Sequence, residues 1–217
     1  MDQDIEIINQ NTRIEKIKNF FLNNSKKIII ISAAIIIIIF GYFILLDVKK
    51  NKRYKIAENY NQILAKYDID KNENFKNKLI EIVNKKDPTY SPLALYFLID
   101  NKVIEDKGKI NELFDLLINK TKLNKEIKNL VIYKKALYNS DNFNENQLLN
   151  LLKPIINSEN VWKSHSLYLL AEYFYSKNQK EKSKEFYIEI INLEESNINI
   201  KLEAQKKLNR DFKWSFF

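Results

Sequence analysis

The sequence predicts an all-α protein in which one membrane-spanning helix precedes an α-solenoid of stacked helix pairs. Residues 28–46 form an uncharged, strongly apolar run with lysines at both ends. The rest of the chain carries apolar residues three and four positions apart, which is the spacing of amphipathic helices. The 217 residues include only two glycines and three prolines, too few for the tight turns of a sheet protein.

The first segment, residues 1–27, contains the stretch "TRIEKIKNFFLNNSKK" at 12–27. Ile14, Ile17, Phe20 and Phe21 fall on one side of a helix because they are three or four residues apart. We expect a short amphipathic helix that rests on the membrane before the spanning segment.

The run 28–46 has the length of a transmembrane helix. Nineteen residues at about 1.5 Å each span about 28 Å, close to the hydrocarbon thickness of a bilayer. A cleaved signal peptide has a shorter apolar run followed by small residues, and none follow here. A buried core helix would keep a polar face over about five turns. We therefore expect a membrane anchor, with its flanking cations at the lipid head groups: Lys26, Lys27, Lys49, Lys50, Lys52 and Arg53.

Residues 47–217 are long enough for one helical domain. The first stripe after the membrane is Ile56, Tyr60, Ile63, Leu64 and Tyr67. For the helix predicted to begin near residue 93, Ser91 is a candidate cap and Pro92 a candidate first helical residue. Periodicity and breaks predict helices over 53–67, 75–86, 93–105, 110–120, 126–139, 145–156, 161–177, 180–194 and 199–212.

The last helix pair follows the tetratricopeptide pattern of large, small and aromatic positions. Small residues stand where the two helices of a repeat cross closely, and aromatic residues fill the groove between neighbouring repeats. Weaker copies occur near Ala94 and Ile127, and such repeats need stacking because one pair cannot bury its apolar face alone. The pattern occupies Leu167, Leu170, Ala171, Phe174, Tyr175, Ser183, Phe186, Tyr187 and Ile190.

Three stretches together resemble the bacterial ancillary SecYEG translocon subunit family (YfgM-like). They are "TRIEKIKNFFLNNSKK", "GYFILLDVKKNKRYKIAENYNQIL" and "ENVWKSHSLYLLAEYFYSKNQKEKSKEFYIEII". The resemblance implies an inner-membrane anchor with a cytoplasmic amino end. It also implies a periplasmic tetratricopeptide repeat-like domain that associates with the Sec translocon and periplasmic chaperones.

Charge alone does not orient the chain. Five Lys and Arg residues lie in the 20 positions before the apolar run and six in the 20 positions after it. The resemblance favours a cytoplasmic amino terminus and a periplasmic carboxyl domain. The net charge is +8. The charged residues are interpreted either as solvated Lys and Glu faces or as a surface that attracts anionic lipid or nucleic acid.

No catalytic constellation stands out. The chain has no Cys and one His, His165, so neither the usual zinc site nor a supported Ser-His-Asp triad can be assembled. We interpret His165 as a packing or surface residue, and Glu194–Glu195 and Asp68/Asp70 as solvated acids. We expect no enzyme activity, cofactor, metal, small-molecule substrate or nucleic-acid partner.

Two aromatic groups leave alternatives open. Tyr168, Tyr173 and Tyr175 form either core or an aromatic binding groove. Trp214, Phe216 and Phe217 either fold back on the last helix or dock a partner.

The function expected from these features is a membrane-anchored protein–protein interaction module. Its partners would be translocon subunits, periplasmic chaperones or client polypeptides. The alternative is a membrane-tethered scaffold of a cell-envelope complex in division or outer-membrane biogenesis.

Overall fold

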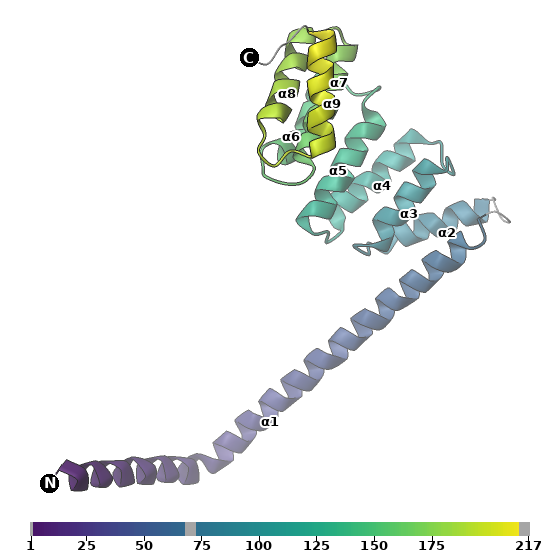
Figure 1. The fold of residues 1–217 in the computed structure, drawn as a ribbon. Helices are drawn as coiled ribbons and strands as arrows, with labels where there is room; N and C mark the ends of the chain where they lie inside the picture. Colours follow the sequence, from purple (N-terminus) through teal and green to yellow (C-terminus); the bar gives the residue numbers. More distant parts are fainter. Residues whose placement is uncertain (1, 68–72, 213–217) are drawn as a thin grey trace. The chain divides into compact units, whose positions relative to one another are not determined.

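The computed structural model describes the backbone of residues 2–67 and 73–212, with side chains from Arg13 onward except Ile17, Phe21 and Ile28. Every helix or strand in this described part is an α-helix, which confirms the all-α class. The helices (Figure 1) are α1 (Asp2–Leu64), α2 (Glu73–Asn84), α3 (Tyr90–Asp100), α4 (Lys107–Lys120), α5 (Lys125–Asn139), α6 (Glu145–Ile156), α7 (Lys163–Ser176), α8 (Lys180–Asn192) and α9 (Ile198–Asp211).

The chain divides into two compact units, Met1–Lys55 and Ile56–Phe217. The predicted segments 1–27 and 28–46 both lie in the first unit, and α1 has no break at either of their ends. In the amphipathic segment Ile14 and Phe20 are exposed, while Ile17 and Phe21 lie outside the described side chains.

The apolar run of α1 is exposed along its length. In the described residues one helix is long and apolar enough to cross a membrane, and none of its apolar window is buried. Ile29, Phe40 and Leu45, for example, keep 67%, 66% and 70% of their surface. The core helix of a soluble protein is mostly buried, whereas this run is exposed, and such exposure fits a lipid environment.

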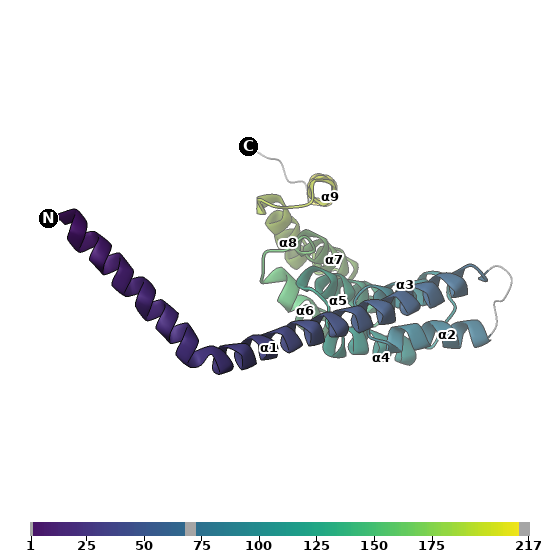
Figure 2. The ribbon, with the colours of Figure 1, turned by 90° about the horizontal axis from the view of Figure 1, so that it is seen from below.

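In the second unit, α2 to α9 pack in sequence order. Each helix contacts the next one, and α2 also contacts α4, α5 contacts α7, and α7 contacts α9. Figures 1 and 2 show this succession of neighbours. Contacts limited to near neighbours are the hallmark of a helical-repeat array. The α7–α8 interface is the most extensive, whereas α3 packs more on α2 than on α4, so the earlier helices do not reproduce the α7–α8 pairing.

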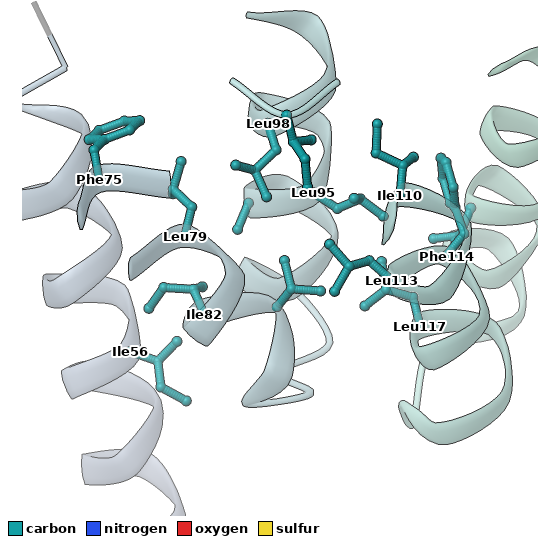
Figure 3. Close-up of a cluster of buried hydrophobic side chains, with 14 residues drawn as sticks. Ile56, Phe75, Leu79, Ile82, Leu95, Leu98, Ile110, Leu113, Phe114 and Leu117 are labelled. Carbon is teal, nitrogen blue, oxygen red and sulfur yellow. The ribbon is translucent and has the colours of Figure 1, made fainter. Parts of the chain in front are cut away.

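The first core cluster joins the end of α1 to α2, α3, α4 and α5 (Figure 3). Ile56 is buried in it, and Tyr60, Ile63, Leu64 and Tyr67 pack against it half-buried, as the stripe predicted. Beyond it, α5, α6 and α7 share a second cluster, and α7, α8 and α9 share a third. Each cluster is built from several successive helices, so no helix pair buries its apolar face alone.

Asparagine side chains begin several helices. The Oδ1 of Asn124 accepts a hydrogen bond from the backbone N–H of Ile127 at 2.8 Å. Asn144 and Gln147 form a reciprocal capping box, with both bonds at 2.9 Å. These oxygens satisfy backbone donors that the first turn of a helix leaves unpaired.

The predicted cap at Ser91 is wrong. Helix α3 begins at Tyr90 and Pro92 is its third residue. The carboxylate of Asp87 accepts hydrogen bonds from the N–H groups of Thr89 and Tyr90, both at 2.9 Å. The Ser91 hydroxyl instead donates to the carbonyl of Ile82 at 2.8 Å, and so ties α3 to the end of α2. Pro92 fits the third position because the N–H groups of a first turn have no partner within the helix.

Candidate interaction surfaces

The residues of the tetratricopeptide-like pattern are packing residues in α7 and α8. Phe186 is half-buried and stacks on Phe174 with ring centroids 5.5 Å apart. Tyr175 is half-buried and meets Phe212 edge-on. The others are buried: Leu167, Leu170, Ala171, Phe174, Ser183, Tyr187 and Ile190. The pattern therefore marks contacts of α7 and α8 with α5, α6 and α9, and it leaves little surface for a ligand.

A polar network closes the carboxyl end of the array. The Tyr187 hydroxyl of α8 donates to the carboxylate of Glu172 on α7. The ammonium of Lys207 on α9 lies 2.7 Å from the same carboxylate. Burial, followed by the hydrogen bond to Glu172, holds the pKa of Tyr187 above its ordinary value. Glu172 thus joins three helices.

The tyrosines of α7 belong to the packed interior more than to a binding groove. Tyr173 is buried, and its hydroxyl donates to the carbonyl of Phe143 at 3.1 Å. Tyr168 is half-buried edge-on against Tyr187. These contacts favour core packing over an aromatic groove for this part of the chain.

His165 packs in an aromatic cluster between α5 and α7. Trp162 stacks on Tyr133 with centroids 5.8 Å apart, and the His165 ring lies 5.4 Å from Trp162 and 6.0 Å from Tyr133. Burial lowers the pKa of His165, partly opposed by the Val161 carbonyl. A lowered pKa keeps the imidazole neutral near pH 7.

The candidate acids are not gathered into a site. Glu194 and Glu195 are exposed between α8 and α9, and Asp68 and Asp70 lie outside the described residues. Among the described side chains of 13–67 and 73–212, no three His, Cys, Asp or Glu residues stand close enough to hold a metal ion.

A groove between α3 and the beginning of α5 is a candidate surface for a ligand. We call it the α3–α5 groove; its open volume is about 540 Å³. Apolar and proline side chains dominate it, with Thr89, Asn124 and Lys122 as polar members. Leu93 remains 42% exposed although it is a large apolar residue. The lining residues are Pro88, Thr89, Pro92, Leu93, Tyr96, Lys122, Asn124, Ile127 and Leu130.

Tyr96 gives the α3–α5 groove a polar feature. Its hydroxyl is buried and has no hydrogen-bond partner among the described residues, which is unusual because buried polar groups are generally paired. Burial, followed by the Asp100 carboxylate, raises its pKa, so the hydroxyl keeps its proton. The ammonium of Lys134 lies 5.4 Å from the centre of the ring. The groove therefore combines apolar walls with two nearby cations.

A second, more polar groove lies between the end of α1 and α2. Its volume is about 310 Å³, and its apolar floor comes from Ile63, Phe75 and Ile82. Those three side chains pack in or against the first core cluster. This groove therefore lies over the first core cluster, between the first two helices of the second unit.

The predicted membrane-flanking cations lie on either side of the apolar run of α1. All are exposed in the structure: Lys26, Lys27, Lys49, Lys50, Lys52 and Arg53. Trp214, Phe216 and Phe217, the candidate docking residues, lie outside the described part of the chain.

The α3–α5 groove is not indicated by the sequence. Leu93 and Ile127 belong to ordinary apolar stripes, and only the structure shows that Leu93 stays exposed while Ile127 is half-buried against the first core cluster. The two prolines beside Leu93, Pro88 and Pro92, were the one local signal, because they interrupt an otherwise helical pattern.

Comparison with known proteins adds no relative: no family model, no curated protein and no solved structure matches this chain.

Proposed function

We propose that this protein is a membrane-anchored interaction module that binds an extended segment of a partner polypeptide in the α3–α5 groove. The observation that carries the proposal is the open apolar groove, in which Leu93 remains exposed. The exposed apolar run of α1 supports the tether.

The chemistry of the groove favours a peptide. Leu93, Ile127 and Leu130 offer apolar contacts to side chains. Tyr96 adds an aromatic ring to the same lining. Lys122 and Lys134 favour acidic side chains in the bound segment. The occupant we propose is therefore an extended segment with apolar and acidic residues.

The resemblance to the YfgM-like family supplies the candidate partners. We propose a tetratricopeptide-like domain on the periplasmic side that engages translocon subunits, periplasmic chaperones or their clients. What supports this is the order of elements, an anchor followed by a helical-repeat array, and the α7–α8 pair whose buried residues fit the repeat pattern.

A site-specific crosslinking experiment tests the groove. A photoreactive amino acid is placed at Leu93 in the full-length chain within membranes, and at Leu202 on α9 as a control, since both leucines are exposed. We expect adducts with a polypeptide at position 93 and not at 202. The substitution Lys122→Glu should weaken these adducts several-fold, whereas Lys153→Glu on exposed α6 surface should not.

The identity of the crosslinked polypeptide separates the two functions. Translocon subunits or periplasmic chaperones support the proposal as stated, while cell-envelope assembly proteins support the scaffold alternative. Equal crosslinking at positions 93 and 202, or adducts indifferent to Lys122→Glu, would remove the groove as the binding site.

A further inference from the structure

The residues that follow the apolar run of α1 carry an unusual concentration of positive charge. Five of the seven residues from Lys49 to Lys55 are Lys or Arg, and the only acid between Leu46 and Glu58 is Asp47. All five cations are exposed. They lie entirely within the first compact unit of the chain.

The helical geometry distributes these cations around the whole helix. Helix α1 continues without interruption from the apolar run through Lys55. At about 100° per residue, Lys49, Lys50, Lys52, Arg53 and Lys55 leave no empty sector wider than about 140°. They form a ring, which we call the cationic collar. A protein partner would meet one side of such a helix, whereas lipid surrounds a membrane helix on every side.

The height of the cationic collar also matches a head-group layer. From Lys49 to Lys55 the helix rises about 9 Å, while the polar layer on each side of the hydrocarbon core is about 5–8 Å thick. Lys and Arg side chains are long and flexible enough to place their charges within that layer. Asp47, the nearest acid, accepts a hydrogen bond from the Asn51 amide at 3.1 Å.

We propose that the cationic collar, Lys49 to Lys55, binds a shell of anionic phospholipid head groups around the exit of the membrane helix. The proposal rests on the membrane anchor of the proposed function, but it is independent of the α3–α5 groove. Its consequence is a local lipid composition enriched in negative charge around residues 49–55.

The cations on the other side of the apolar run provide a matched comparison. Arg13, Lys16, Lys18, Lys26 and Lys27 are also five charges, but they extend over about 21 Å of helix. Such a spread exceeds one head-group layer, so only Lys26 and Lys27 lie directly beside the apolar run.

The test measures lipid selectivity with the full-length chain reconstituted in phosphatidylcholine vesicles that contain phosphatidylglycerol. Spin-labelled versions of both lipids report which is held at the protein surface. We expect phosphatidylglycerol to associate about two- to fivefold more strongly, as expected for one head group beside one or more cations. At about 1 M salt, where the screening length is about 3 Å, the preference should largely disappear.

Two variants locate the source of the selectivity. Replacing the five cations of the cationic collar by Gln should remove most of the preference, and replacing the five cations of the amino-terminal side by Gln should retain most of it. Both variants change the net charge equally. Equal preference for the two lipids by the native chain, or a preference that survives loss of the cationic collar, would overturn the proposal.

Extraction with alkaline carbonate separates this failure from failure of the anchor. A chain that stays in the membrane pellet but shows no lipid selectivity refutes the cationic collar alone. A chain released by carbonate refutes the membrane anchor and the cationic collar with it.

Discussion

The amide pair between Asn111 on α4 and Asn139 on α5 leads to a sharp prediction about stability. The Nδ2 of Asn111 donates to the Oδ1 of Asn139 at 3.0 Å, and the Nδ2 of Asn139 donates back to the Oδ1 of Asn111 at 2.8 Å. The Nδ2 of Asn139 also donates to the Lys135 carbonyl at 2.8 Å. Asn139 is only 3% exposed, so a group that loses its partner there cannot turn to water.

The expected losses follow from these bonds. Asn139→Ala removes two interhelical hydrogen bonds, each contributing about 1 kcal/mol, and leaves the Asn111 oxygen without that partner at a cost of about 1 kcal/mol. We therefore expect its free energy of unfolding to fall by about 2–3 kcal/mol. Asn111→Ala should lower the free energy of unfolding by a similar amount, because it leaves the buried Oδ1 of Asn139 without that partner.

The double variant distinguishes a coupled pair from two separate contributions. With both amides removed no partner is stranded, so the double loss should stay near that of one single variant, a coupling of about 2 kcal/mol. The assay is urea unfolding of the full chain in detergent micelles, followed by far-ultraviolet circular dichroism. Asn209→Ala on exposed α9 surface is the control, with a change under about 0.5 kcal/mol. Losses of the two single variants that simply add would refute the reasoning.

Three further predictions use the same unfolding assay. Lys102 has a left-handed backbone with φ of 51°, a conformation that strains any residue with a side chain. Lys102→Gly should therefore raise the free energy of unfolding by about 1 kcal/mol, and a lower free energy would contradict this strain. Glu172→Gln should lower the free energy of unfolding by about 1–2 kcal/mol because Glu172 pairs with Lys207. Glu203→Gln, at an exposed acid, should lower it by less than about 0.5 kcal/mol. Equal losses in the two variants would refute the network. Burial raises the pKa of Tyr168 to about 12, so between pH 10 and 12 the folded state holds a proton that the unfolded state releases. The free energy of unfolding should therefore fall as the pH rises from 10 to 12. In the Tyr168→Phe variant this free energy should fall less steeply.

The elements that sequence reasoning located well are those whose signal is local. The stripe from Ile56 to Tyr67 has strict helical spacing and packs on the first core cluster as expected. The apolar run of α1 is defined by length and composition alone, and its exposure in the structure agrees with an anchor. The α7–α8 pair was found because small and aromatic residues alternate there with a recognisable order.

The features that escaped depend on competition between neighbouring side chains. Ser91 and Asp87 are both good capping residues, and only the path of the α2–α3 loop decides that Asp87 caps while Ser91 bonds to Ile82. Asn124 and Asn144 cap the starts of helices, which composition alone does not indicate. At the other ends, Lys86, Lys102 and Asn178 adopt left-handed backbone, which lets helices end in a chain with two glycines.

The α3–α5 groove could not be predicted because exposure is a property of the assembled array. An apolar stripe says which face of a helix seeks a partner, but not which residues the neighbouring helices fail to cover. The exposure of Leu93 and the unpaired hydroxyl of Tyr96 appear only when α2, α3, α4 and α5 are in place.

The most direct measurement is the membrane topology of the full-length chain, and the absence of cysteine makes it clean. Single cysteines are introduced as Glu15→Cys before the apolar run and Glu112→Cys on exposed α4 surface. Cells are then treated with a membrane-impermeant maleimide after the outer membrane has been permeabilised. The account predicts labelling at position 112 in intact cells and at position 15 only after lysis. Labelling of both positions in intact cells, or of position 112 only after lysis, would contradict a periplasmic module held by one membrane-spanning helix.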